Sequence, residues 1–352
     1  MIIRNLGFII GTLGPNSLVV KHVLGKDESQ VRFLLRAPVL YFYKMNKEFI
    51  EFQEQVGKVK HLKRTGWVVR QVPNPETVAA HSWRMALMAI YKQKELKKIG
   101  ADVNHVIEMC LLHDIGESVI GDIVPEIHQT GSKKISAETK KKTEKEAVCF
   151  LAQKYNFSEL ETIFNEYENQ ETLEAKVVKN LDKLDMLLQA YEYQVAYPDL
   201  TRLNEFMQFN EKDIDLPLFL GDIKEIKLRQ FENKQNKNEF IDSLIAAGRL
   251  KHELYNPVKA NIPDYDTVAA HLFRTALIAI CFNKNYELIR TIISADKPKN
   301  DLDKRAVFEL ETLENILQAH EYAKCYPNDE SLSVYKTLNS SVLGNFVELQ
   351  DK

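Results

Sequence analysis

An internal repeat restricts the fold of this chain more than any other feature of its sequence. Residues 266–280 read DTVAAHLFRTALIAI and match residues 76–90, which read ETVAAHSWRMALMAI. Further along, LQAHEY at residues 317–322 matches LQAYEY at residues 188–193. A chain of 352 residues is long enough for two domains of ordinary size. We therefore predict three parts: an N-terminal extension of unclear structure over residues 1–44, a first repeat over residues 45–215 and a second repeat over residues 216–352.

Apolar residues recur at three- and four-residue intervals in both repeats, as they do on one face of an α-helix. The pattern predicts helices over residues 45–61, from residue 103 to the turn at His113, and over residues 173–197. Asn74 and Pro75 are typical of the N-cap and first turn of a helix, here the one that carries His81. We expect an all-α fold, with only residues 1–44 forming short strands or irregular structure.

Metal-binding side chains stand inside the helical patterns of the first repeat, at His81, His113, Asp114 and Asp182. Any one of them alone is more often a core residue with a hydrogen-bond partner than a ligand. Together, two imidazoles and two carboxylates suit one divalent transition metal such as Mn, Co, Fe, Ni or Zn. Such an ion lowers the pKa of a bound water from about 16 to about 7 and polarises a phosphoryl oxygen. The set therefore predicts a hydrolase.

Two further acids follow the pair His113-Asp114 in the sequence. Glu117 comes one helical turn later and is placed to orient or deprotonate the attacking water. Asp122 is placed to position that water or to protonate a leaving oxygen. Asp185 adjoins the apolar face of the helix over residues 173–197, and a carboxylate buried there needs a cation or a hydrogen-bond partner.

The second repeat keeps the helical pattern but loses the metal-binding set. Ala295 stands at the position of His113, and only Asp296 survives from that pair. Glu311 takes the place of Asp182. We expect the second repeat to be metal-free and structural, either covering the first site or forming a dimer surface.

Charge, hydropathy and cysteine content argue against several classes of protein. Forty-seven basic and 50 acidic residues give a formal charge of -3, so nothing favours nucleic acid or an anionic membrane as a partner. No segment approaches the ~20 apolar residues of a membrane span, and the apolar run at residues 1–11 lacks a signal-peptide cleavage site. Four scattered cysteines without a CxxC motif indicate reduced thiols and a cytoplasmic protein. The lysine-rich residues 132–145 are expected to form a solvated loop that leads into a helix.

The motifs of the first repeat resemble those of the HD-domain metal-dependent phosphohydrolases. In order, they are KRTGWV at residues 63–68, PETVAAH at 75–81, HDIGE at 113–117, GDI at 121–123 and LDKLDMLLQA at 181–190. Within that superfamily they are similar to the 5'-deoxynucleotidase branch, and the likeness covers residues 46 to 200. The resemblance implies an HD-domain helical bundle, usually dimeric, that removes the 5'-phosphate from deoxyribonucleoside monophosphates.

The resemblance also implies roles for individual residues. It assigns one metal ion to four ligands: His81, His113, Asp114 and Asp182. Glu117 and Asp122 would be the catalytic and phosphate-side acids, and Trp67 would shape the nucleoside pocket. Either Arg64 or Arg70 would contact the phosphate or the sugar.

Some features of the chain depart from the family pattern or leave alternatives open. The second repeat and residues 1–44 are absent from the usual single-domain members, so we expect either a homodimer or a monomer whose second repeat replaces a dimer partner. Asp185 would lie behind a ligand or at the surface. Only His128 lies between the His-Asp pair and Asp182, which favours one metal over the di-iron site of oxygen-using relatives. Alternative functions are another nucleotide phosphohydrolase or phosphodiesterase, or a nucleotide sensor without turnover.

Overall fold

A computed structural model describes residues 47–125, 135–207, 214–232, 238–256, 265–329 and 332 of the chain. The predictions for residues 1–44, for a domain start at Met45 and for His128 lie outside these residues.

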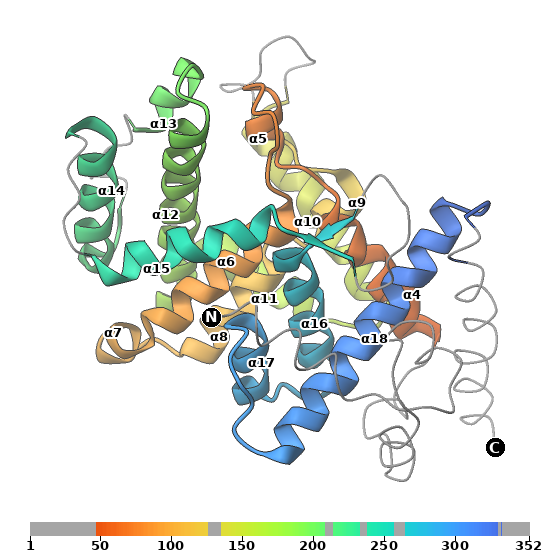
Figure 1. Ribbon diagram of the computed structural model, residues 1–352. Coiled ribbons are helices and arrows are strands. Elements are labelled where there is room, and N and C mark those ends of the chain that lie inside the picture. The colour runs from red at the N-terminus through yellow and green to blue at the C-terminus, as the bar shows by residue number, and fades with distance from the viewer. Residues whose placement is uncertain are drawn as a thin grey trace, which may run out of the picture. The chain divides into compact units, whose positions relative to one another are not determined.

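Helices make up almost all of the regular structure that is described (Figure 1). Their bounds are α4 Lys47–Gly57, η3 Lys58–Lys60, α5 Thr65–Val68, α6 Val78–Tyr91, α7 Gln93–Lys98, α8 Val103–Leu112, α9 Glu117–Ile120, α10 Ala137–Lys154, α11 Glu159–Asn169, α12 Leu173–Ala196, η5 Thr201–Leu203, α13 Asn204–Met207, η7 Pro217–Phe219, α14 Leu220–Glu232, α15 Glu239–Gly248, η8 Arg249–Lys251, α16 Val268–Asn283, α17 Tyr286–Ile293 and α18 Asp301–Cys325. Strands β1 (Leu254–Tyr255) and β2 (Asp266–Thr267) pair with each other. The prediction of an all-α fold is confirmed.

The chain divides into two compact units, neither of which is a single continuous stretch. The larger unit comprises Val56–Glu253 and Thr267–Phe273. The smaller unit comprises Met1–Gln55, Leu254–Asp266 and Arg274–Lys352. The boundaries at residues 45 and 216 describe the repeat in the sequence and stay a prediction.

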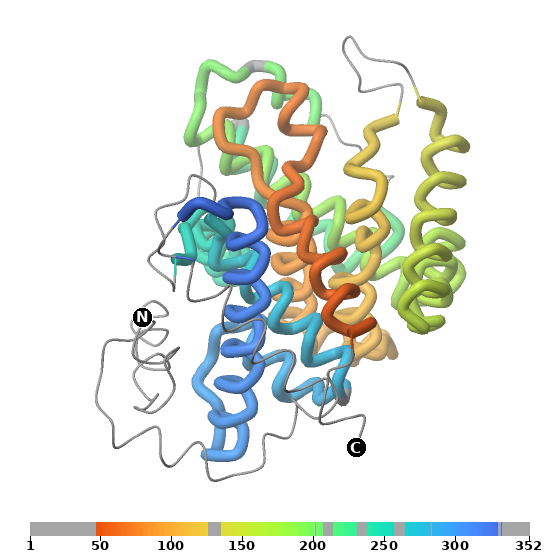
Figure 2. Tube along the Cα trace, turned by 90° about the vertical axis from the view of Figure 1, so that its right-hand side faces the viewer, coloured from red at the N-terminus to blue at the C-terminus, as the bar shows by residue number. Residues whose placement is uncertain are grey.

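Three helices form the centre of the larger unit. Helix α6 packs against α8, and α12 packs against both of them (Figures 1 and 2). Residues 78–90 of α6 are all buried, while α12 buries Leu181, Leu184 and Leu188 completely. Each apolar side chain buried in this way stabilises the fold by roughly 1.5–3 kcal/mol, so these helices form a well-packed support for the site.

The start of α6 differs from the sequence prediction. Thr77, rather than Asn74 and Pro75, is its N-cap, and the Thr77 hydroxyl accepts a 3.2 Å hydrogen bond from the Ala80 amide. An isolated antiparallel bridge between Lys63 and Thr77 keeps the chain extended up to that residue. The helix can therefore begin only at Val78, where a threonine cap satisfies an amide that would otherwise lack a partner.

The lysine-rich stretch is largely helical, which corrects the prediction of a loop. Ser136 caps α10 by accepting a 3.1 Å hydrogen bond from the Thr139 amide, so residues 137–145 form the first turns of that helix. A helix places successive residues on different faces. Lys142 accordingly points to solvent, with 78% of its side chain exposed, whereas the Lys140 side chain is only 28% exposed.

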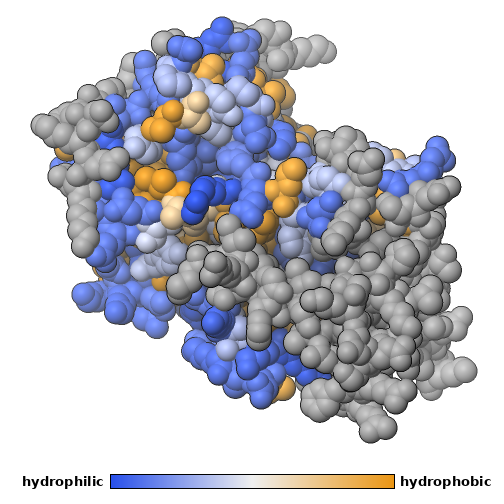
Figure 3. Space-filling view, in the orientation of Figure 1, coloured by the Kyte–Doolittle hydropathy of each residue, from blue (hydrophilic) through white to orange (hydrophobic). Residues whose placement is uncertain are grey.

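The smaller unit contains α17 and the long helix α18, which pack against each other. Hydrophilic residues predominate on the coloured part of the face drawn in Figure 3, where hydrophobic residues form only small separate groups. In the part of the chain that the structure describes, no helix has the length and apolar character needed to cross a membrane.

Candidate metal site

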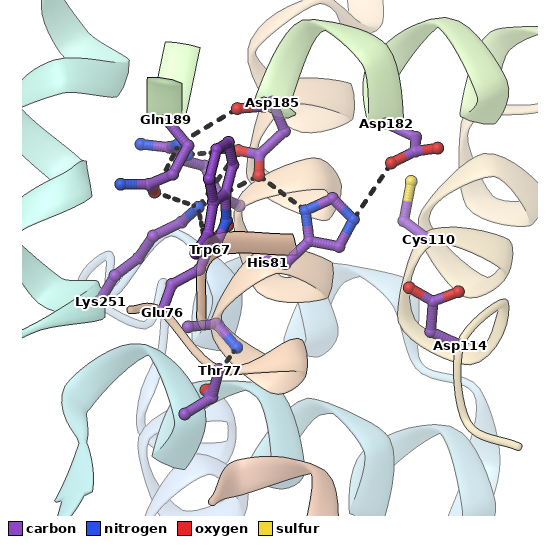
Figure 4. A network of polar contacts seen from close by, with 12 residues as sticks. Trp67, Glu76, Thr77, His81, Cys110, Asp114, Asp182, Asp185, Gln189 and Lys251 are labelled. Atoms are coloured by element: carbon purple, nitrogen blue, oxygen red, sulfur yellow. Dashed lines mark hydrogen bonds and ion pairs between the residues drawn. The ribbon is translucent and has the colours of Figure 1, made fainter. Parts of the chain in front are cut away.

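The three central helices of the larger unit bring the four predicted ligands together, and Figure 4 shows three of them: His81, Asp114 and Asp182. His81 comes from α6, His113 and Asp114 follow the end of α8, and Asp182 comes from α12. His81, His113 and Asp114 each offer a ligand atom, and these atoms lie within 4.8 Å of one another. The Nε2 atom of His81 lies 3.4 Å from Oδ1 of Asp182.

Both imidazoles are held through their Nδ1 atoms. Nδ1 of His81 makes a 2.7 Å hydrogen bond with Oδ2 of Asp185, and Nδ1 of His113 makes one of 2.9 Å with the carbonyl oxygen of Cys110. Because a carboxylate and a carbonyl accept hydrogen bonds, each Nδ1 donates, which leaves the Nε2 lone pair of each neutral ring available. Both Nε2 atoms are buried. That of His113 lies 3.1 Å from Oδ2 of Asp114 and that of His81 lies 3.4 Å from Oδ1 of Asp182, and neither makes a hydrogen bond of good geometry with the described residues.

The electrostatics of the site keep Asp114 and Asp182 ionised. Burial alone would raise the pKa of Asp182, but Lys179 and His81 bring it well below its usual value. Burial would also raise the pKa of Asp114, but the neighbouring His113 lowers it. For His81, burial and the charge of Arg64 lower the pKa, and the contacts of its two ring nitrogens with Asp182 and Asp185 outweigh this and raise it. The two acids therefore present negative charge toward the imidazoles.

These side chains fit a divalent metal ion. Two buried imidazole Nε2 atoms face two ionised carboxylates, which is the mixed donor set that transition metals prefer. Each imidazole is also oriented by an acceptor on its far nitrogen, as metal-binding histidines in proteins usually are. Asp185 provides that acceptor for His81 and is completely buried. It therefore lies behind a ligand, and the alternative of a surface carboxylate is wrong.

Glu117 and Asp122 have different surroundings. Glu117 begins α9 and is 6% exposed, and its Oε2 has no hydrogen-bond partner in the described structure. Burial, together with the charges of Asp114 and Asp122, raises the pKa of Glu117 well above its usual value. Asp122 follows Gly121, whose φ of 79° makes the turn. Its Oδ2 accepts a 2.6 Å hydrogen bond from the Thr65 amide, which ties this loop to the start of α5.

A cavity of about 350 Å³ opens beside the ligands. It is lined by three of them and by both acids, together with Arg64, Lys140, Tyr167 and Lys179. The last three were not predicted. Tyr167 packs edge-on against the His113 ring with centroids 5.2 Å apart, and Lys179 lies 3.4 Å from Oδ2 of Asp182. The i, i+3 spacing of Lys179 and Asp182 on α12 was the one signal in the sequence that pointed to such a contact.

A second, more apolar cavity of about 200 Å³ shares Arg64, Asp122 and Lys140 with the first. Its other walls include apolar residues from α5, α12, α13 and the loop after α9: Trp67, Ile123, Val124, Pro125, Met186 and Phe206. Trp67 is 2% exposed and its Nε1 donates a 2.9 Å hydrogen bond to Glu76. The cavity with Trp67 in its wall therefore adjoins the cavity of the metal site.

The two predicted arginines differ in how their guanidinium groups are used. Nη1 of Arg64 is buried and has no hydrogen-bond partner among the described residues. Arg70, in contrast, forms an ion pair with Glu205, donates a 2.8 Å hydrogen bond to the carbonyl of Gly66, and stacks on Phe206 with 4.4 Å to the ring centroid. Arg64 thus lines both cavities with a donor to spare, whereas Arg70 is occupied in holding the wall of the second.

Comparisons with known proteins identify the family of this chain. A model of the HD domain family matches residues 56–217. The 5'-deoxynucleotidase HDDC2 of Danio rerio is 32% identical over 204 residues, which cover 56% of this chain and 97% of that protein. The human 5'-deoxynucleotidase HDDC2 is 33% identical over 191 residues, covering 53% of this chain and 88% of that protein. A conserved hypothetical protein of known structure from Pyrococcus furiosus is 30% identical, covering 57% of this chain and 98% of its own, with a TM-score of 0.39.

The matched region contains all of the residues described for the site, from Arg64 to Phe206. Nearly the whole length of the Danio rerio protein is covered at an identity above 30%. The chain therefore belongs to the HD-domain family, on its 5'-deoxynucleotidase branch.

Proposed function

We propose that this protein removes the 5'-phosphate from deoxyribonucleoside monophosphates, with one divalent metal held by the four ligands His81, His113, Asp114 and Asp182. One observation carries the proposal: the buried Nε2 atoms of two histidines lie beside the carboxylates of Asp114 and Asp182, which line a cavity together with cationic side chains. Metal ligands and cations in one cavity suit a phosphate ester, which needs both charge neutralisation and an electrophilic partner.

Arg64 is the residue that binds the phosphate. Its pKa is raised, because the charges of Glu76, Asp182 and Asp122 outweigh the effect of burial, so the guanidinium stays charged. An arginine can bind phosphate oxygens through two parallel N–H bonds. Lys140 and Lys179 line the same cavity and add positive charge on its other walls.

The acids of the site handle the protons of the reaction. A divalent ion in this site supplies Lewis acidity, which acidifies a bound water and polarises the phosphoryl group. Glu117 lies in the same cavity with one unpaired carboxyl oxygen and a raised pKa, so it accepts a proton more readily than an ordinary glutamate near neutral pH. Asp122 lies between the two cavities, where a carboxyl group can protonate the oxygen that leaves with the nucleoside.

The nucleoside occupies the second cavity. The side chains of Trp67, Met186 and Phe206 offer apolar contacts to a base, while Arg64 stands at its junction with the first cavity. At about 200 Å³ it lies below the ~300–1,000 Å³ of typical ligand pockets, which favours a mononucleotide over a cyclic dinucleotide.

Phosphate release tests this function. The purified protein is loaded separately with Mn²⁺ and Co²⁺ and incubated with the four 5'-dNMPs, with 5'-NMPs, a 3'-dNMP, dNTPs and a cyclic dinucleotide as alternatives. We expect turnover of 5'-dNMPs above all others. Tight binding of a dNMP without phosphate formation would instead identify a nucleotide sensor, and preference for a dNTP or a cyclic dinucleotide would identify another hydrolase.

Glu117→Gln separates the chemistry from metal binding. Since the amide cannot take up the proton, we expect the rate of phosphate release to fall by roughly 10²–10⁴-fold. The metal content, measured by elemental analysis, should stay at the level of the unmodified protein because Glu117 is not among the four ligands. Turnover at the original rate would show that Glu117 has a different role.

A further inference from the structure

One buried cation near the metal site comes from far along the chain. Lys251 ends the short helix η8, within the predicted second repeat, and is 1% exposed. Its ammonium group forms an ion pair with Glu76, lies 3.1 Å from Oδ2 of Asp185, and donates a 3.0 Å hydrogen bond to Oε1 of Gln189 (Figure 4). All of these residues belong to the larger compact unit.

Two partners of Lys251 accept hydrogen bonds from residues of the metal site and of the second cavity. Asp185 accepts the hydrogen bond from Nδ1 of His81, a predicted metal ligand. Glu76 accepts the hydrogen bond from Nε1 of Trp67, in the wall of the second cavity. A single ammonium therefore connects the carboxylate behind the metal site with the carboxylate behind the nucleoside cavity.

The charges of this cluster require Lys251. Asp185 and Glu192 share the guanidinium of Arg84, and Glu76 lies beside them with its carboxylate buried. Without Lys251, Glu76 and Asp185 would lose the ammonium group that lies between them, and a buried carboxylate that loses its partner is strongly unfavourable. Burial tends to raise the pKa of Glu76, and the charge of Lys251 is the largest contribution that brings it below its usual value.

Gly248 allows the chain to bring Lys251 close to this cluster. A Cβ atom at Gly248, three residues earlier, would collide with the Glu192 carboxylate and lie 2.9 Å from Nη1 of Arg84. Only glycine lets the end of α15 approach the cluster without displacing these side chains. The segment GRLKH at residues 248–252 also repeats GKVKH at residues 57–61, so the lysine belongs to the repeated pattern.

We propose that Lys251 is a positioning residue for the metal site: it fixes Asp185, and through it His81, so that the second repeat completes the site of the first. The inference rests on the proposed function because it takes His81 as a metal ligand. Mutation of residues that orient metal ligands typically weakens metal affinity by about 10–100-fold. The second repeat thus has a part in the site although it lacks the ligands itself.

The test compares two buried lysines in the full-length protein. Lys251→Met keeps the aliphatic stem and removes the charge. Lys92→Met is the matched control: Lys92 forms a 2.7 Å ion pair with Asp222 in the same unit and is similarly buried. It lies 11 residues after His81, at the far end of α6, about 16 Å away along the helix axis. The Kd for Mn²⁺ is measured by competition with a chelator, and the visible absorption of bound Co²⁺ reports the ligand geometry.

We expect Lys251→Met to raise the Kd for Mn²⁺ by about 10–100-fold and to change the Co²⁺ spectrum, with partial rescue by Lys251→Arg. Lys92→Met should bind Mn²⁺ within about twofold of the unmodified protein. An unchanged Kd in Lys251→Met, or equal weakening in both variants, would overturn the inference. If Lys251→Met does not fold, Lys251→Arg is used for the test instead. The bulkier guanidinium should still shift the Co²⁺ spectrum. A spectrum identical to that of the unmodified protein would count against the positioning role.

Failure of this inference can be told apart from failure of the proposed function. The metal measurements use no nucleotide, so a protein that releases no phosphate from any dNMP could still show the predicted loss of Mn²⁺ affinity in Lys251→Met. In the opposite case, phosphate release with unchanged metal affinity would reject the positioning role of Lys251 and leave the proposed function intact.

Discussion

The two repeats share a buried framework but differ in the residues placed upon it. In the first repeat, Arg84 pairs with Asp185 and Glu192; in the second, Arg274 pairs with Glu314, at 3.0 Å, and with Glu321. Each arginine lies on one helix and its acids lie on another, in the same order along the sequence. The matching ion pairs support the predicted duplication.

Helix starts and a tyrosine contact extend the likeness. Thr267 accepts a 3.2 Å hydrogen bond from the Ala270 amide, as Thr77 does at the start of α6. The hydroxyl of Tyr322 accepts a hydrogen bond from the Asp266 amide, and Tyr193 does the same for Glu76. These contacts satisfy backbone amides at the start of a buried helix, so they serve the fold irrespective of any metal.

The difference lies at the ligand positions. Ala295 follows α17 where His113 follows α8, and the next residue, Asp296, is exposed, in contrast to the Asp114 carboxylate in the cavity wall. The second repeat keeps the ion pairs of its arginine although it lacks the ligand set. Such ion pairs alone therefore do not indicate a metal site. In this chain the ion-pair framework occurs both with the predicted ligand set and without it.

The largest expected effect distinguishes Asp114 of the first repeat from Asp296 of the second. Asp114→Ala should abolish metal binding and reduce phosphate release to background, because it removes a ligand and an ionised acid from the cavity. Asp296→Ala, its counterpart, should leave both unchanged. Metal content and phosphate release measured side by side check this, and activity that survives in Asp114→Ala would contradict the assignment of the site.

The next effect concerns the shared framework. Arg84→Met and Arg274→Met should each lower the free energy of unfolding by roughly 3–5 kcal/mol, because each leaves buried carboxylates without their main cation. Only Arg84→Met should also weaken Mn²⁺ binding, through Asp185. Urea denaturation followed by far-ultraviolet circular dichroism measures the stability. A cost below about 1 kcal/mol for Arg274→Met would mean that the second framework contributes little.

Local sequence patterns were sufficient to predict the helices that carry the site and the ligand candidates on them. The apolar spacing over residues 173–197 predicted α12, observed at Leu173–Ala196, within one residue at its end. His81, His113 and Asp182 stood out because polar ligand side chains interrupted apolar faces. The start of α6 was misplaced because the cap depends on the bridge between Lys63 and Thr77, which is a tertiary contact.

Features that depend on distant segments were not predictable. The wall formed by Lys140 and Tyr167 requires α11 to pack against α12 and α10 to pack against α11. Nothing in the local pattern of α10 marks one lysine of the run as different from the others. The choice between Arg64 and Arg70 depended on Glu205, which lies 135 residues from Arg70. Lys251 reaches Glu76 across 175 residues, and a lone lysine gives no sign of burial in sequence.

Phosphate binding should distinguish the repeats as well. The first repeat has Arg64 and Arg70 between Lys60 and Glu76, whereas the second has no arginine between Lys251 and Asp266. Because Arg64 has the unused donor, Arg64→Met should raise the inhibition constant for inorganic phosphate by roughly 10–100-fold, the cost of losing a charged hydrogen bond. Arg70→Met should change it by less than about threefold. The reverse order would assign phosphate binding to Arg70.

A final contrast concerns the residues that precede the repeated GxxKH segments. Glu54, three residues before Gly57, forms ion pairs with His320 at 3.1 Å and Lys324 at 2.7 Å, within the smaller unit. The counterparts in the repeat are Ile245, Tyr191 and Val195, which line a cavity of about 430 Å³ in the larger unit. At these three positions one copy has a charged cluster and the other has no charged side chain, so the acid-sensitive ion pairs of Glu54 have no counterpart in the larger unit.

Glu54→Gln tests this contrast with the smallest expected effect. The hydrogen bond with His320 has the largest effect on the pKa of Glu54. Together with the contact with Lys324 it outweighs the effect of burial and lowers this pKa from 4.5 to about 2. Since the folded-state pKa lies below the ordinary value, the stabilisation is present above pH 4.5 and is lost as the pH falls toward 2. At pH 6 the free energy of unfolding of the unmodified protein should therefore be about 1 kcal/mol higher than that of Glu54→Gln. This value allows for solvent screening, because the cluster is partly exposed. Urea denaturation at pH 6 and pH 3 should show this gap narrowing, whereas a gap independent of pH would indicate that Glu54 stabilises the unit by packing instead of charge.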